Sequence, residues 1–467
     1  MTHQHWAGAH QVVDVIAAIN ADQVAPSPLA NDHVLRTREH EESKSPAAHH
    51  VSGEFEKLAV QGRRLARLCR GCHRSPGLQI IAATAGGAGS RILHAASSRS
   101  VAEPEARRVR NGGDQAVSGS VPESSRLRIA LVGAGGFGTY TCELIDRQPE
   151  IDLVGVADTD GGKARRLGND RAVPYWTDHR ALLDECDCDA VAIVTTHSTH
   201  RDIAVDAAAA GRHIFCEKTM AITVAECHDM VEAADAHGVK LMVGHKRRFR
   251  PASAALRRAL GTAGLGRPLA VNIRGFFGRR ITGFWRERSL CGGLLYWAGV
   301  HDVDTLRYLF GEVASVYAVL GPKFRPEVSD QEDAISVALT FQSGMVGSLQ
   351  VSTFYPMATY QTAFGFDIVC ERGGISYNPH DLSITTQLED QPSGVVRLEH
   401  NSPDGAYDTE WSSFAAWVLR DEAPVLTSED GLRCVEILQA AYLSAATGSR
   451  VDLPLDRNER RPFDDLS

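Results

Sequence analysis

Short apolar runs alternate with amphipathic stretches of helical length along the middle of this chain. The apolar runs cover residues 128–133, 152–158, 190–196, 213–218 and 240–245. Each run is bounded by glycine or polar residues, which is typical of a buried strand. Strands that alternate with helices predict a parallel sheet with right-handed crossovers. We therefore predict a doubly wound α/β domain over residues 126–246.

The pattern changes after this domain, because the apolar positions now alternate with polar ones over longer runs. The clearest runs are residues 269–278, 314–321, 334–342, 345–354 and 366–371. Such alternation predicts a large, mostly antiparallel sheet with one open face. Two helical patterns follow, at residues 411–421 and 428–448. We therefore expect residues 247–467 to form a second α/β domain.

Residues 1–125 show little periodicity and are rich in His, Ser, Ala, Gly and Arg. We expect them to be a poorly structured leader or extension. A C-x-x-C-H string at residues 69–73 matches a haem attachment motif, but no export signal accompanies it, so we interpret it as chance.

The composition of the chain argues against some classes of binding partner and location. The net charge of −9 argues against a nucleic-acid surface. No apolar run reaches the length that spans a bilayer, so we expect no membrane segment. The ten cysteines in so long a chain do not resemble a disulfide framework. A cytoplasmic location is the expectation, and no residue pattern predicts a metal site.

A glycine-rich hexamer, Gly133 to Gly138, lies where the first predicted strand gives way to a helix. It matches G-x-G-x-x-G, the dinucleotide-binding motif of Rossmann domains. In that motif Gly133 permits the tight turn, Gly135 lets a pyrophosphate approach the backbone, and Gly138 lets the helix pack closely. Gly136 and Phe137 complete the loop.

Asp158 ends the second predicted strand, about twenty residues beyond the glycines. An acid at this position accepts hydrogen bonds from the adenosine ribose hydroxyls. Its charge repels a 2′-phosphate, so NAD is the expected cofactor and NADP the less favoured one. Arg165 and Arg166, further along, are the residues that favour NADP.

Four further segments occur in a recognisable order. They are VTTHSTH (residues 194–200), CEKT (216–219), GHKRRFRP (244–251) and CGGLLYWAGVHDVD (291–304). With the glycine loop, they resemble the glucose–fructose oxidoreductase, inositol dehydrogenase and MocA family over about residues 126–455. The resemblance implies an NAD(P)-dependent enzyme that oxidises a secondary alcohol of a sugar, cyclitol or related polyol. It also implies a homodimer or homotetramer that associates through the open sheet.

The resemblance assigns two catalytic groups. Lys218 matches the family lysine that reaches the reacting hydroxyl, and His301 matches the family histidine. An alcohol proton is hard to remove near neutral pH, so a positioned base suits this reaction. Thr219 stands where the family has proline.

The same resemblance assigns the binding residues. Those expected beside the cofactor are Thr195, Thr196, His197, His200, Glu217 and Lys218. Those expected beside the substrate are Lys246, Arg247, Arg286, Trp297 and His301. Arg288 is a further candidate for a basic pocket around an anionic or heavily hydroxylated substrate.

Trp297 departs from the family pattern, because an aspartate usually stands four residues before the histidine. Three interpretations remain open. In the first, Lys218 and His301 suffice to remove the hydroxyl proton. In the second, Asp302 or Asp304 supplies the carboxylate that is missing at position 297. In the third, the protein binds NAD without oxidising alcohols and acts as a regulatory protein. A redox-neutral glycosidase or lyase that retains NAD is a further alternative. Trp297 itself offers an aromatic face for a sugar ring or an aglycone.

Overall fold

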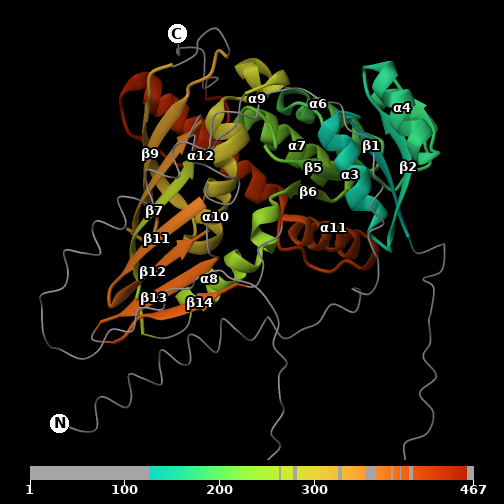
Figure 1. Ribbon diagram of the computed structural model, residues 1–467. Coiled ribbons are helices and arrows are strands. Elements are labelled where there is room, and N and C mark those ends of the chain that lie inside the picture. The colour runs from blue at the N-terminus through green and yellow to red at the C-terminus, as the bar shows by residue number, and fades with distance from the viewer. Residues whose placement is uncertain are drawn as a thin grey trace, which may run out of the picture. The chain divides into compact units, whose positions relative to one another are not determined.

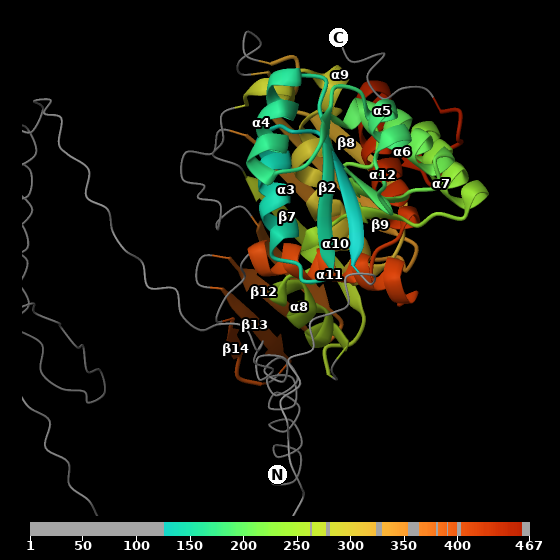
Figure 2. The same cartoon turned by 90° about the vertical axis from the view of Figure 1, so that its right-hand side faces the viewer.

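A six-stranded parallel sheet forms the N-terminal part of the described chain (Figures 1 and 2). The computed structural model describes residues 126–261, 264–276, 281–323, 329–353, 364–379, 382–389, 391–398 and 403–459. The expected leader, residues 1–125, lies outside these ranges. The strands are β1 (Leu127–Val132), β2 (Ile151–Ala157), β3 (Tyr175–Trp176), β4 (Ala190–Ile193), β5 (His213–Glu217) and β6 (Leu241–Gly244). The predicted parallel sheet is confirmed, and β3 adds a strand too short to leave a pattern.

The strand order is β3-β2-β1-β4-β5-β6, so β1 lies between β2 and β4. The order reverses between β1 and β4, and ligands of doubly wound sheets bind outside the strand ends at such a point. The connecting helices are α3 (Gly136–Asp146), α4 (Gly161–Arg171), α5 (His179–Glu185), α6 (His200–Ala209) and α7 (Val224–His237). Thr223 caps α7 in a reciprocal arrangement with Glu226, and Gly238 ends it in the left-handed conformation.

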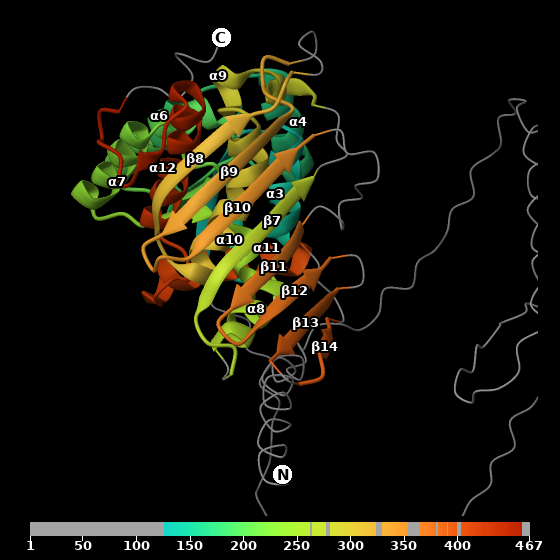
Figure 3. The same ribbon diagram turned by 90° about the vertical axis from the view of Figure 1, so that its left-hand side faces the viewer.

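A nine-stranded sheet dominates the C-terminal part, and Figure 3 shows it face-on with helices behind it. Its order is β14-β13-β12-β11-β7-β10-β9-β8-β15. The strands are β7 (Pro268–Phe276), β8 (Val313–Leu320), β9 (Ala334–Phe341), β10 (Val346–Ser352), β11 (Phe364–Cys370), β12 (Gly373–Asn378), β13 (Ser383–Leu388), β14 (Gly394–Arg397) and β15 (Val451–Asp452). Only the pairing of β7 with β10 is parallel among those described, so the sheet is mostly antiparallel, as predicted.

The inner face of this sheet is apolar. In β9, Ile335, Val337, Leu339 and Phe341 are buried while the residues between them are more exposed. This alternation follows from the two-residue period of a strand. The helices of this half are α8 (Pro251–Gly261), α9 (Arg288–Cys291), α10 (Val300–Phe310), α11 (Pro403–Arg420) and α12 (Ser428–Thr447). No helix of the described ranges is both long and apolar enough to cross a bilayer.

Helix α11 packs on the parallel sheet, although it follows strands β7 to β14 of the second sheet in sequence (Figure 1). Trp411 stacks on Phe215 of β5, with ring centroids 4.0 Å apart, and Phe414 meets the same ring edge-on. Burial of these large rings removes apolar surface from water and attaches the helix to the sheet. The C-terminal part of the chain therefore reaches the cofactor side of the first sheet.

Two buried ion pairs link the turn after β6 to helix α10. Arg247 Nη1 lies 2.6 Å from Asp302, and Arg248 Nη2 lies 2.7 Å from Asp304. Both aspartates are fully buried. Removing one member of such a pair leaves an uncompensated buried charge.

Asp304→Ala is expected to lower the free energy of unfolding by about 2–3 kcal/mol, because Arg248 loses its bidentate partner and keeps its contact with Asp430 (2.8 Å). Urea unfolding followed by circular dichroism measures this change. Asp152→Ala is the control, since the Arg126–Asp152 pair is partly exposed and its loss costs about 1 kcal/mol or less. Equal losses in the two variants would contradict the structural role of Asp304.

Candidate active site

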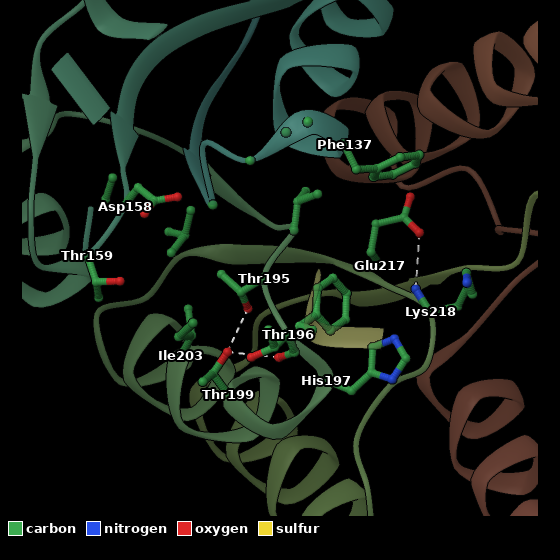
Figure 4. Close-up of a pocket in the computed structure, with 18 of the residues that line it drawn as sticks. Phe137, Asp158, Thr159, Thr195, Thr196, His197, Thr199, Ile203, Glu217 and Lys218 are labelled. Atoms are coloured by element: carbon green, nitrogen blue, oxygen red, sulfur yellow. Dashed lines mark hydrogen bonds between the residues drawn. The ribbon is translucent and has the colours of Figure 1, made fainter. Parts of the chain in front are cut away.

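A cavity of about 960 Å³ lies at the carboxyl ends of the parallel strands. Side chains from both halves of the described chain line it. The lining residues named in the sequence prediction are Gly133, Gly135, Gly136, Phe137, Gly138, Asp158, Thr195, Thr196, His197, Glu217, Lys218, Lys246, Arg247, Trp297 and His301. Figure 4 shows Asp158 and Thr159 toward one end, and His197, Glu217 and Lys218 toward the other.

The glycine loop has the shape that a pyrophosphate needs. Gly133 has φ +110°, and a Cβ there would lie 2.4 Å from the carbonyl oxygen of Val194. A Cβ on Gly138 would lie 1.9 Å from the carbonyl oxygen of Gly133. By contrast, a Cβ on Gly135 would meet no atom within 4 Å, so open space adjoins the backbone where α3 begins. Helix N-termini bind phosphate groups through free amides and the helix dipole, so this loop fits NAD.

Asp158 lies at the other end of the cavity, directly after β2. Its carboxylate accepts hydrogen bonds from the amides of Ala134 (2.7 Å) and Asp160 (2.8 Å). These contacts fix the acid beside the glycine loop, where ribose hydroxyls of a dinucleotide lie. Arg165 and Arg166 do not line the cavity, whereas Lys163 and Arg180 do. No local pattern marks Lys163 and Arg180, because they lie on separate helices, α4 and α5.

Thr195, Thr196 and His197 follow β4 and line the middle of the cavity. Thr199 donates a hydrogen bond to the Thr195 hydroxyl (2.8 Å), which holds the loop. His197 Nδ1 lies 2.7 Å from the carbonyl oxygen of Cys291, so this ring also joins the two halves.

The structure corrects the placement of His200. This residue begins α6, is fully buried and does not line the cavity. Its ring nitrogens lie 2.9 Å from the Thr219 carbonyl and 3.3 Å from the Thr195 carbonyl. Burial lowers the pKa of His200 to about 4, so the ring is neutral at pH 7 and supports the loop from behind.

Lys218 extends from the end of β5 into the end of the cavity away from Asp158 (Figure 4). Its Nζ donates to the carbonyl oxygen of Trp297 (3.1 Å) and lies 5.8 Å from the centroid of the Trp285 ring. The neighbouring Thr219 hydroxyl donates to the carbonyl oxygen of Tyr296 (2.7 Å). Both carbonyls belong to a π-helical turn, Leu295–Gly299, and such turns free backbone groups at functional sites. Thr219 therefore connects β5 to the segment that carries Trp297, and the peptide bond between Lys218 and Thr219 is cis.

His301 lies in the first turn of α10 and lines the cavity. Burial lowers the pKa of this histidine well below its ordinary value, and the nearby positive charges of Lys218, Arg247 and Lys246 lower it further. A neutral imidazole at pH 7 can accept a proton. Within the described residues, its Nδ1 is buried without a hydrogen-bond partner.

The two aspartates considered as substitutes for a carboxylate at position 297 do not line the cavity. Asp302 and Asp304 instead form the buried ion pairs with Arg247 and Arg248. Glu217 lines the cavity, and its Oε2 accepts a hydrogen bond from the backbone amide of Lys218 (3.2 Å). Burial raises the pKa of Glu217. Glu217, which the sequence predicted beside the cofactor, is thus a carboxyl group of the cavity lining directly next to Lys218 in the chain.

The predicted basic pocket is partly realised. Lys246 lines the cavity, and its Nζ contacts the Tyr407 hydroxyl and lies 3.9 Å from the centroid of that ring. Burial lowers the pKa of Lys246 to about 8. Arg247 also lines the cavity and is paired with Asp302 (2.6 Å).

Two arginines that were predicted beside the substrate lie outside the cavity, so the basic pocket contains fewer residues than expected. Arg286 is exposed and is absent from the lining. Arg288 pairs with Glu332 (3.0 Å) and is buried. Their neighbours Phe284 and Trp285 line the cavity instead. The signal in the sequence for Phe284 and Trp285 is an aromatic pair within a polar stretch. No local pattern marks Tyr407, which lies on α11.

A cluster of His245, Asp304 and Cys434 places three potential metal-binding atoms within 4.8 Å of one another. Its surroundings oppose a cation, because Arg248 binds both oxygens of Asp304 and Arg307 Nη1 lies 4.0 Å from the sulfur. Burial raises the pKa of Cys434 to about 12, so the thiol is protonated at neutral pH. We therefore assign this cluster to packing and not to a metal.

Comparisons with known proteins agree with this geometry. Residues 127–245 match the model of an oxidoreductase family with an NAD-binding Rossmann fold, and residues 257–453 match the family's C-terminal alpha/beta domain. The chain is 29% identical over 356 residues to scyllo-inositol 2-dehydrogenase (NAD(+)) of Bacillus subtilis, covering 71% of this chain and 98% of that protein. It is 27% identical over 332 residues to inositol 2-dehydrogenase of Acidothermus cellulolyticus, covering 70% and 94%.

Among solved structures, the WlbA dehydrogenase of Bordetella pertussis, in complex with NADH and UDP-GlcNAcA, is similar. Its TM-score is 0.62 at 25% identity, covering 71% of this chain and all of that chain. The two family matches together span well over half of the sequence. The chain therefore belongs to this oxidoreductase family, with an NAD-binding Rossmann domain followed by the family's α/β domain.

Proposed function

We propose that this protein is an NAD-dependent dehydrogenase that oxidises a secondary alcohol of a sugar, cyclitol or related polyol. The observation that carries the proposal is the convergence of Lys218 and His301 in the cavity that the glycine loop also lines. The inositol dehydrogenases among its relatives support the same class of substrate.

Lys218 and His301 have complementary roles in this proposal. NAD, when bound, accepts the hydride from the carbon that carries the hydroxyl. The Nζ of Lys218 is held at the Trp297 carbonyl, and in this proposal its charge stabilises the alkoxide that develops on the substrate oxygen. His301, neutral at pH 7, takes the hydroxyl proton.

Production of NADH with a panel of sugars and polyols tests the proposal, and we expect continuous turnover with at least one of them. Cleavage of a glycoside with tight retention of NAD and no net NADH would instead indicate a redox-neutral glycosidase or lyase. Binding of NAD with no turnover of any compound would indicate a regulatory protein.

We also propose a homodimer or homotetramer that associates through the outer face of the nine-stranded sheet (Figure 3). Exposed large apolar residues lie on strands of this sheet: Leu269, Tyr317, Val319, Val346, Val369 and Val395. Apolar residues gathered on one face favour association. The assembly and a cytoplasmic location both stay predictions, as do the domain boundaries at residues 126–246 and 247–467.

A further inference from the structure

Four aromatic rings gather at the substrate end of the cavity. Phe284, Trp285, Trp297 and His197 all line it. The ring centroids of Trp285 lie 4.0 Å from Phe284, 5.5 Å from Trp297 and 5.7 Å from His197. We call these four side chains the aromatic wall.

Gln331 sets the orientation of the tryptophan that replaces the family aspartate. The indole Nε1 of Trp297 donates to Oε1 of Gln331 (2.9 Å), and Nε2 of Gln331 donates to the carbonyl oxygen of Trp285. Gln331 is only 2% exposed, so this amide is a fixed part of the protein interior. The single N–H of the indole is therefore used inside the protein. What Trp297 presents to the cavity is its apolar surface.

The aromatic wall adjoins the group assigned to the reacting hydroxyl, because Lys218 Nζ lies 5.8 Å from the centroid of the Trp285 ring and donates to the backbone carbonyl of Trp297 (3.1 Å). Polar side chains also line the cavity, among them Glu217, Lys246, Arg247, His301 and Tyr407. The lining therefore combines hydrogen-bonding groups with the aromatic wall.

We propose that the substrate is a glycoside with an apolar aglycone, whose sugar hydroxyls meet the polar residues and whose aglycone stacks on Trp285 and Trp297. This inference rests on the proposed function and names its substrate class. A free cyclitol carries hydroxyls around its whole rim, so some of them would lose water without gaining partners at the aromatic wall. An aryl or alkyl substituent has no such cost and gains contact with two indole rings.

Calorimetric binding to the NADH-loaded protein tests the proposal without requiring turnover. The probes are matched methyl and phenyl β-D-pyranosides of glucose, galactose, mannose and xylose. We expect at least one phenyl glycoside to bind about tenfold more tightly than its methyl counterpart. Trp297→Leu and Trp285→Leu should each reduce this ratio toward one, whereas Trp297→Phe should retain most of it.

Trp417→Leu is the matched control, because Trp417 lies on α11 outside the cavity lining and contacts Lys240. Its ratio should equal that of the unmodified protein. The proposal is overturned if no phenyl glycoside binds more tightly than its methyl partner, absence of binding included. It is also overturned if the tryptophan variants lose NADH affinity while the ratio is unchanged, since the wall would then contact the nicotinamide.

These outcomes separate the inference from the proposed function. Oxidation of free polyols with no preference for phenyl glycosides would leave the dehydrogenase assignment standing and remove the inference. Selective binding of phenyl glycosides that are never oxidised would support the aglycone site and contradict the dehydrogenase assignment.

Discussion

Replacing Lys218 with methionine is expected to lower kcat/KM for the best substrate by about 10²–10⁴-fold. Methionine keeps the length of the side chain and removes the ammonium group that lies at the Trp297 carbonyl. The developing negative charge on the substrate oxygen then has no cation held against it. Because the glycine loop and Asp158 are untouched, NAD affinity should change by less than about tenfold.

Initial rates and NAD titrations on the same preparation measure the two effects. Lys240→Met is the control, since Lys240 pairs with Asp421 and is absent from the cavity lining. A second readout is the pH profile. The charge of Lys218 lowers the pKa of His301, so the acidic limb of kcat/KM should move to higher pH in the variant. Survival of full turnover in both Lys218→Met and His301→Ala would refute the assigned mechanism.

Gly138→Ala is expected to weaken NAD binding by about 100-fold, equivalent to about 3 kcal/mol, and to lower the melting temperature. The added methyl group would lie 1.9 Å from the carbonyl oxygen of Gly133. That oxygen belongs to the backbone of the tight turn and cannot rotate away. Helix α3 must therefore retreat from β1, and its first amides move with it out of reach of a pyrophosphate.

Gly405→Ala provides a matched control, because Gly405 is the third residue of α11 as Gly138 is of α3. A Cβ on Gly405 would meet no atom within 4 Å, so NAD affinity should stay unchanged and stability should stay equal or rise by up to about 1 kcal/mol. Fluorescence titration with NADH and thermal unfolding report both quantities. If Gly138→Ala binds NAD as tightly as Gly405→Ala does, the close packing at the glycine loop has no role in binding.

Most of the fold was predictable because its causes are local. The apolar runs of β1, β2, β4, β5 and β6 and the alternation along β9 identify the two sheets. The shortest strand, β3, was not predictable, since two residues carry no period. The reach of α11 back to the first sheet was not predictable either, because Trp411 and Phe215 meet across almost two hundred residues.

The residues of the site also fall into those that a local pattern predicts and those that it does not. The glycine loop, Asp158, Lys218 and His301 could be predicted as residues of the cavity lining, because each lies at a strand or helix end that a short pattern marks. The structure was needed to show that His200 turns inward while His197 lines the cavity, and that Asp302 and Asp304 are paired with arginines. It also decided that Tyr407, Trp285 and Trp297 meet around Lys246 and Lys218. The physical reason is that a side chain's direction and partners depend on packing between elements distant in sequence, and no local pattern records that packing.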